Sequence, residues 1–292
     1  MKSFVKIVLL LIVPLNVFSQ EIMQRPDARD IFSDKTINEQ YEPVKLVFDF
    51  SKKDVLSYDY SAFNDSFSES SLFPGTTNQK SKTTSKLTLN MLGNGYAEIV
   101  FKDIIVDSQI SFDIPNDDIS EDAEPVNTKF GPRTAVYQYL SEDGKFLNSQ
   151  DMEFKIKLMM PSSGLIIKEN EILEEDVIMP FNFSGSLLQI KGKLYIRGIG
   201  IYLVEDKQYL KIESRLEINS DDIPDVLKDQ LELLIVSEGI YYYDIKEKSY
   251  YSGDITTTTS ISAKTIGLNL IDSTISQKMN ATEHIEYKAS SD

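Results

Sequence analysis

The sequence predicts an all-β protein, with a mostly antiparallel curved sheet or open barrel-like sheets formed by two similar halves. Three observations support this fold class. Apolar and polar residues alternate, as at Leu46, Phe48 and Phe50, which is the period of a half-buried strand. Residues 238–254 (EGIYYYDIKEKSYYSGD) form a predicted β-hairpin with a charged turn, and residues 134–150 repeat the same plan.

The two predicted hairpins align without a gap, which places Tyr137 on Tyr241 and Tyr139 on Tyr243. Successive side chains of a strand point to opposite faces, so each Tyr-x-Tyr pair should share one face. We expect both pairs to face the concave side of the sheet, with Tyr242 facing outward.

Other segments also align. Residues 165–173 (LIIKENEIL) match residues 48–56 (FDFSKKDVL), with a charged turn at the same place. We therefore predict a first β repeat over 42–152 and a second over 153–290, as halves of one domain or two packed subdomains. A chance likeness between β-rich segments is the alternative.

The first nineteen residues are predicted to be a signal peptide. Two lysines precede an apolar run too short to span a bilayer, and small residues precede the expected cleavage site after Ser19. We expect an exported, soluble protein, periplasmic or extracellular, with no transmembrane span after cleavage. Residues 20–41 are polar and aperiodic, and are predicted to form a linker.

Charge and cysteine content restrict the function. Cleavage of the signal would leave 28 basic and 46 acidic residues, a net charge of −18. Such a chain repels phosphate backbones, so we expect no nucleic-acid partner. The chain has no cysteine, so it is not a lipoprotein anchored through cysteine, and its fold must be stabilised by burial without disulfides.

Several segments have less regular patterns. Residues 61–85 are rich in Ser, Thr, Asn and Gly and predict a loop, and residues 113–132 predict an acidic loop. Residues 153–158 alternate like a strand. One short helix is predicted near 223–234, because Pro224 suits an early helical position and the apolar residues after it have helical spacing.

The chain resembles a family of uncharacterised exported β-rich bacterial proteins, a domain of unknown function common in Bacteroidota. The likeness covers residues 44–287 and depends on a Gly-aromatic-Asp hairpin, here with Gly239 and Asp244. The chain departs from that pattern at Lys248, where a turn glycine is expected and the first hairpin has Gly144. The resemblance implies export and β architecture, and no activity.

No catalytic, cofactor-binding or metal-binding residues are predicted. His284 is the only histidine, and we expect it to face solvent in the last strand; with no cysteine, the usual His and Cys zinc sites are excluded. The acidic stretch 113–124 lacks the spacing of an ordered calcium loop, and 219–225 is a weaker acidic cluster. Ser273 lies in a short Asp-Ser-Thr match to a bacterial O-glycosylation pattern.

Two functions remain open, and neither is enzymatic. In the first, the protein is a binding or carrier module whose concave aromatic face holds a hydrophobic small molecule. In the second, it is a structural or interaction component of the periplasm or cell envelope, and its Tyr-rich strands contact a protein partner. An enclosed apolar pocket of several hundred cubic ångströms would favour the first, and a filled core the second.

Overall fold

The computed structural model describes residues 41–71, 73–113, 124–145, 150–161, 164–183, 186–204, 207–266 and 274–290. The predicted signal peptide and nearly all of the predicted linker lie outside these ranges. So do most of the acidic stretch 113–124 and Ser273. What was expected of these segments remains a prediction.

Twelve strands, one α-helix and two short 3₁₀ turns make up the described chain. The strands are β1 (Val44–Lys45), β2 (Val55–Ser70), β3 (Phe73–Met91), β4 (Tyr96–Asp113), β5 (Val126–Ser141), β6 (Ile166–Ile167), β7 (Ile172–Phe183), β8 (Ser186–Val204), β9 (Lys207–Asn219), β10 (Leu231–Asp244), β11 (Ser249–Ile266) and β12 (Thr274–Ala289). The helix is α2 (Gln150–Met159), and the 3₁₀ turns are η1 (Ser220–Asp222) and η2 (Asp225–Leu227).

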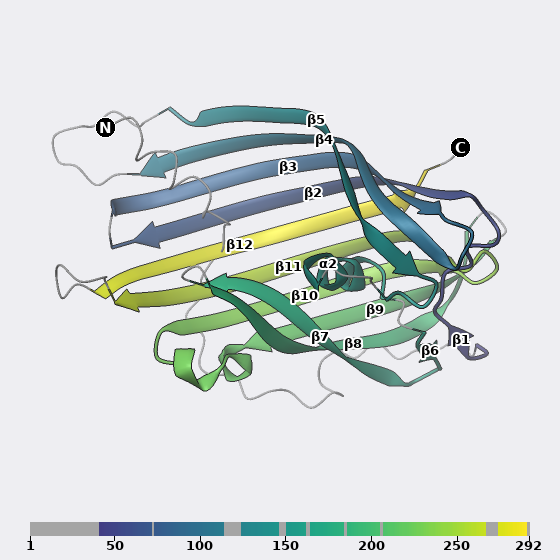
Figure 1. The fold of residues 1–292 in the computed structure, drawn as a ribbon. Helices are drawn as coiled ribbons and strands as arrows, with labels where there is room; N and C mark the ends of the chain where they lie inside the picture. Colours follow the sequence, from purple (N-terminus) through teal and green to yellow (C-terminus); the bar gives the residue numbers. More distant parts are fainter. Residues whose placement is uncertain are drawn as a thin grey trace.

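Ten strands form one antiparallel sheet in the order β5-β4-β3-β2-β12-β11-β10-β9-β8-β7. The last strand, β12, pairs with β2 and so joins the two halves of the chain into a single sheet. The sheet curls but does not close, because β5 and β7 are its edges (Figure 1). The predicted fold class, an all-β open curved sheet with one short helix, is confirmed.

Both edge strands contain proline, Pro132 in β5 and Pro180 in β7. Proline has no N–H to offer a further strand, so it is tolerated at an edge and discourages pairing with another chain. This placement explains how long edge strands coexist with an open sheet.

Helix α2 lies against the concave face, in front of β10 and β11 (Figure 1). This corrects the strand predicted over 153–158. Phe154, Ile156 and Leu158 do alternate, but the residues that are almost fully buried are Ile156, Met159 and Met160, which have the i, i+3, i+4 spacing of one helix face. The apolar residues of this segment fit both the period of a strand and the period of a helix, and packing against the sheet favours the helix.

The helix predicted near 223–234 is wrong in position. The chain forms the single turn η2 there and enters β10 at Leu231. Leu231, Leu233 and Ile235 are buried while their neighbours are less so, which is the period of a strand. Val226 was part of the apparent helical stripe and is 81% exposed.

Two predicted loops are also wrong. Residues 61–85 belong mostly to β2 and β3, which pair along almost their whole length, and 126–132 belong to β5. Ser and Thr side chains fit a pleated strand when both neighbouring strands satisfy the backbone, as β12 and β4 do here. Composition alone therefore misassigned a central part of the sheet.

The hairpin over 238–254 is confirmed as β10, a charged turn and β11. Lys248 has φ of 48° and Gly144 has φ of 79°, so both occupy the left-handed region at the corresponding turn position. A lysine tolerates this conformation less well than glycine. In the first half β5 is followed by α2, which begins at Gln150. Whether the two halves superpose stays a prediction.

Among the described residues no helix is both long enough and apolar enough to cross a membrane.

Candidate functional site

The concave face of the sheet is divided into two parts. The part near the β10–β11 turn is filled by α2, the segment 45–50 and a group of tyrosines. The part nearer the other ends of these strands, where the 3₁₀ turns lie, is not covered by α2 (Figure 1). We call these the filled half and the open half.

Tyrosine hydroxyls fix the helix in the filled half. Three of them donate hydrogen bonds to carbonyls at and just after the end of α2: Tyr241 to Leu158, Tyr250 to Pro161, and Tyr287 to Met159 at 2.6 Å. The last carbonyls of a helix have no partner within the helix, and a buried unpaired carbonyl is costly. The sheet therefore supplies the C-terminal cap of its own helix.

Glycines in the sheet make room for these rings. A Cβ on Gly239 would lie 2.1 Å from the Tyr241 hydroxyl, and one on Gly253 would lie 2.4 Å from the Tyr287 ring. Each ring thus packs over a neighbouring backbone that lacks a side chain. Burial raises the pKa of Tyr241, Tyr250 and Tyr287 well above the ordinary value for tyrosine.

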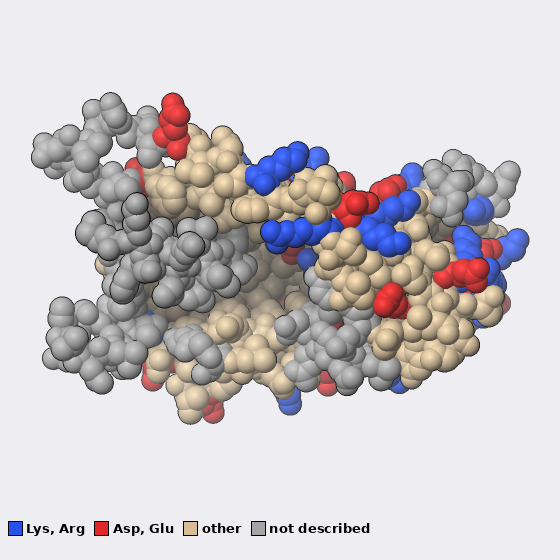
Figure 2. Space-filling model, turned by 45° about the horizontal axis from the view of Figure 1, so that its top comes forward, with Lys and Arg blue, Asp and Glu red and all other residues tan. Residues whose placement is uncertain are grey.

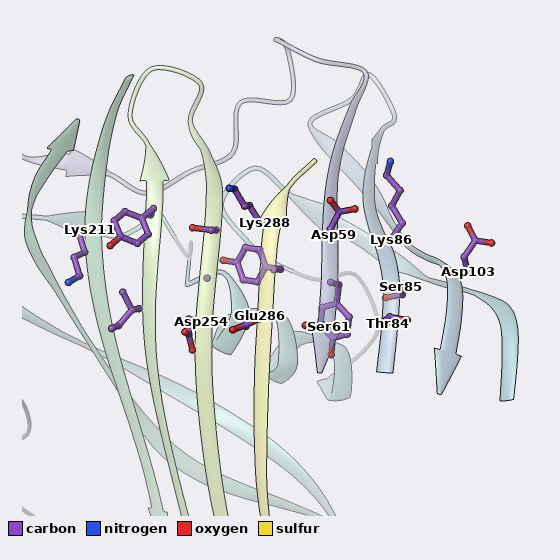
Figure 3. A pocket seen from close by; sticks show the side chains of 16 residues that line it. Asp59, Ser61, Thr84, Ser85, Lys86, Asp103, Lys211, Asp254, Glu286 and Lys288 are labelled. Carbon is purple, nitrogen blue, oxygen red and sulfur yellow. The ribbon is translucent and has the colours of Figure 1, made fainter. Parts of the chain in front are cut away.

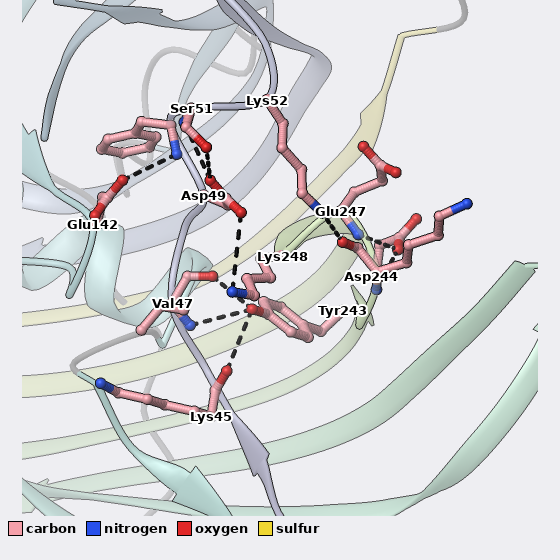
Figure 4. Close-up of polar contacts among 12 residues, drawn as sticks. Lys45, Val47, Asp49, Ser51, Lys52, Glu142, Tyr243, Asp244, Glu247 and Lys248 are labelled. Atoms are coloured by element: carbon pink, nitrogen blue, oxygen red, sulfur yellow. Dashed lines mark hydrogen bonds and ion pairs between the residues drawn. The ribbon is translucent and has the colours of Figure 1, made fainter. Parts of the chain in front are cut away.

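Tyr243 joins β10 to the segment 45–50. Its hydroxyl donates to the Val47 carbonyl at 2.5 Å and accepts from the Val47 N–H at 3.2 Å (Figure 4). Burial raises the pKa of Tyr243 to about 12. The same segment buries Leu46 and Phe48 in the core and contacts the β10–β11 turn, where the Asp49 N–H donates to the Lys248 carbonyl at 3.1 Å.

Lys157 connects α2 to the edge strand β7. Its ammonium lies 2.9 Å from Glu175 on β7 and 3.3 Å from Glu153 on the helix. Burial acts to lower the pKa of Lys157, but the two carboxylates outweigh it and raise that pKa. The helix is thereby fixed to the sheet at an edge as well as at its centre.

In the open half, one wall of the concave face is apolar and exposed. Cross-strand pairing puts Ile110 opposite Val126 and Val106 opposite Phe130, on the face shared with the buried core of β3. Val126 and Phe130 are each 51% exposed. Phe112, on the same face, is 46% exposed. Large apolar side chains that face inward yet contact solvent are typical of a binding surface.

The opposite wall comes from β7 and β8. Phe181 and Phe183 stack with ring centroids 6.5 Å apart and share the inward face with the buried Met179. The floor between the walls has small buried side chains, Ala281 on β12 and Ser66 on β2. Because these side chains are short, the surface of the sheet between the two walls lies below the large apolar side chains on either side.

The space-filling view shows a hollow near the centre of the molecule whose visible walls are mostly uncharged (Figure 2). Lysines and acidic residues gather mainly on the outer surfaces in that view. The concave wall that contains Val126 and Phe130 is half exposed, so it differs from the enclosed pocket that would have decided between the two predicted functions.

The outward face of the sheet carries a second depression, of about 860 Å³ (Figure 3). It crosses β9, β10, β11, β12, β2, β3 and β4, and its charged lining residues are Asp59, Lys86, Asp103, Lys211, Asp254, Glu286 and Lys288. Ile240 and Tyr242 supply apolar surface.

The expectation for the tyrosine pairs holds in the second half of the chain only. Tyr241 and Tyr243 are buried on the concave face, and Tyr242 lines the outer depression. In the first half Tyr139 is 43% exposed. A register shift lies between the pairs Glu98–Tyr139 and Ile99–Tyr137, so a β-bulge changes the phase between the two tyrosine positions.

His284 lies in the last strand, as predicted, and is partly exposed, but it is not isolated. Its Nε2 is 3.2 Å from Glu286, and its Nδ1 is 3.1 Å from the Thr256 hydroxyl and 3.5 Å from Asp254. The acidic cluster 219–225 has a structural role: the Asn219 side chain and the Asp222 carboxylate form a capping box around η1.

Sequence reasoning missed the residues of the open half. The alternation of Val106, Ile110 and Phe112 with polar residues was a usable signal, but it runs into a stretch predicted as loop. No member of this wall was singled out.

No protein-family model matches the chain, and no curated protein matches it. Among solved structures, a structure titled "Lipid-protein interactions in lipovitellin" aligns with 86% of this chain at 8% identity and a TM-score of 0.36. The alignment spans 26% of that structure's own chain.

Proposed function

We propose that the protein is an exported, non-enzymatic carrier that binds an apolar molecule in the open half of its concave face. The observation that supports it is the wall made by Phe112, Val126 and Phe130. These side chains face inward, as core residues do, yet remain about half exposed. Covering them with an apolar ligand removes that surface from water at roughly 25 cal/mol per Å².

The filled half supports the same proposal by contrast. In the filled half, α2 covers the inward-facing positions of the sheet. The hydroxyls of the tyrosines there already donate hydrogen bonds to carbonyls at and just after the end of the helix. The ligand site therefore shifts from the tyrosine face that the sequence favoured to the part of the face without a helix.

Two valines on β5 provide a matched test. Val126 is 51% exposed on the concave face, and Val136 is 62% exposed on the opposite face, where it pairs with Val100. Binding of the apolar dye N-phenylnaphthylamine is measured by fluorescence for both aspartate variants. Burying a valine side chain stabilises by about 1.5 kcal/mol or more, so Val126→Asp should weaken binding about tenfold or more.

Val136→Asp should leave dye binding unchanged within about twofold. Equal affinities for wild type and both variants would contradict the proposed site. Absence of dye binding by the wild type would contradict the carrier function itself.

A protein partner is the second candidate, and the outward face is the observation that favours it. Tyr202 and Tyr242 meet edge to face with centroids 6.1 Å apart, and Lys211 lies 5.6 Å from the Tyr202 ring centre. Tyrosine is enriched in protein interfaces. The double variant Tyr202→Ala, Tyr242→Ala should no longer capture a protein partner from the native cell envelope, and its dye binding should be unchanged. Unchanged capture of the partner would exclude this face as the partner-binding surface.

A further inference from the structure

Three side chains from β11 and β12 converge on the outward face of the sheet. Asp254 pairs across the strands with Glu286, and Thr256 pairs with His284, so the four positions form a compact square. Asp254, His284 and Glu286 each offer a ligand atom, and these three atoms all lie within 4.8 Å of one another.

The geometry of the histidine favours coordination. The Thr256 hydroxyl at 3.1 Å from Nδ1 holds the ring and leaves Nε2 beside the Glu286 carboxylate at 3.2 Å. Zinc binds nitrogen and oxygen ligands at about 2.0–2.2 Å, which in a tetrahedron separates neighbouring ligands by about 3.3–3.6 Å. Nε2 and the Glu286 oxygen are therefore already near the spacing that one ion requires. The Asp254 oxygen lies 3.5 Å from Nδ1, so its side chain must rotate toward Nε2 to complete the site.

We propose that Asp254, His284 and Glu286 bind one divalent transition-metal ion of the zinc or copper type. One imidazole with two carboxylates suits these ions better than magnesium or calcium, which prefer oxygen ligands alone. The three residues lie on neighbouring strands bonded along their whole length, so little chain must be ordered on binding.

The proposed metal site borders the outer depression. Asp254 and Glu286 line the outer depression of about 860 Å³. Three protein ligands leave a coordination position for water or for a group on a bound molecule. The ion would thus present an open position to that depression. The inference is independent of the proposed apolar site, which lies on the other face of the sheet.

The test is zinc titration by calorimetry, with full-length protein that has been treated with chelator and carries no histidine tag. The wild type should bind one ion per chain. Loss of an outer-shell partner alone weakens metal sites about tenfold or more, so losing a ligand in His284→Ala or Glu286→Gln should do at least as much.

Asp59→Asn is the matched control, because Asp59 lines the same depression but is not among the three ligands. It should bind zinc like the wild type. The His284→Ala variant should unfold at the wild-type urea concentration, since the side chain is 37% exposed on the outward face of the sheet. Electron paramagnetic resonance with Cu²⁺ should show one coupled imidazole nitrogen, absent in His284→Ala.

Lack of saturable zinc binding by the wild type would overturn the proposal. So would equal weakening by Asp59→Asn and His284→Ala, because diffuse attraction to an acidic surface would produce that result.

Discussion

The hydroxyl of Tyr287 should stabilise the fold measurably, while the hydroxyl of its neighbour Tyr58 should not. The two rings contact edge to face at 5.6 Å, and both are almost fully buried. Tyr287 donates to the Met159 carbonyl at 2.6 Å, whereas the Tyr58 hydroxyl has no hydrogen-bond partner among the described residues. Removing one oxygen from each ring therefore tests the helix cap in a single environment.

The magnitudes follow from these contacts. Tyr287→Phe leaves a buried carbonyl at the end of α2 without its partner, which costs about 1–3 kcal/mol. Tyr58→Phe removes a polar group that is buried without a hydrogen bond, so it should be neutral or stabilise by up to about 1 kcal/mol. Both changes keep the ring and its packing.

The assay is urea unfolding followed by far-ultraviolet circular dichroism, because the chain has no tryptophan to report by fluorescence. Tyr287→Phe should lower the midpoint without changing the slope, and Tyr58→Phe should not lower it. Equal destabilisation by the two variants, or a change below about 0.5 kcal/mol for Tyr287→Phe, would refute the role assigned to the hydroxyl.

Three further predictions concern the β10–β11 hairpin and the buried tyrosines. Tyr243→Ala should cost about 3 kcal/mol or more in urea unfolding, and Tyr242→Ala less than half of that, because only Tyr243 is buried; equal costs would contradict the assignment of faces. Lys248→Gly should raise the free energy of unfolding by about 1 kcal/mol, since glycine adopts positive φ without strain; a lower stability would argue against strain there. Burial raises the pKa of Tyr243 to about 12 from 10.0. The folded state thus holds the phenolic proton more tightly than the unfolded state does. The stability that this difference contributes to the fold is complete below pH 10 and is lost as the pH rises toward 12. Tyrosinate absorbance should rise together with unfolding, and ionisation of all tyrosines in a still-folded protein would be inconsistent with their burial.

The fold class could be predicted because alternation survives wherever one face of a strand is buried. Alternation correctly marked Leu46 and Phe48 as core residues, but the strand expected there is wrong, because β1 ends at Lys45 and β2 begins at Val55. The hairpin at 238–254 was placed correctly. The turn at Lys248 was also recognised as a position suited to glycine, and its positive φ agrees.

The helix could not be placed because the sequence carried competing periods. Phe154, Ile156 and Leu158 alternate, yet the buried carbonyls and the concave sheet surface select a helix at that place. Conversely, the apolar spacing after Pro224 looks helical, but Leu231 and Leu233 are held in a strand by pairing with β11. Tertiary pairing outweighs local pattern at both places.

The candidate site could not be predicted from the sequence for a related reason. Residues 113–132 were assigned to an acidic loop, so the wall containing Val126 and Phe130 had no predicted strand to lie on. The convergence of Asp254, His284 and Glu286 depends on the register between β11 and β12, and the sequence does not specify that register.

Native mass spectrometry of the protein purified from its own host tests the central claim most directly, since that claim is that the open half of the concave face holds an apolar molecule. The wild type and Val136→Asp should carry an additional mass that organic extraction identifies as an apolar compound, and Val126→Asp should have lost most of it. Bare polypeptide in all three, or an adduct that Val126→Asp retains fully, would contradict the account.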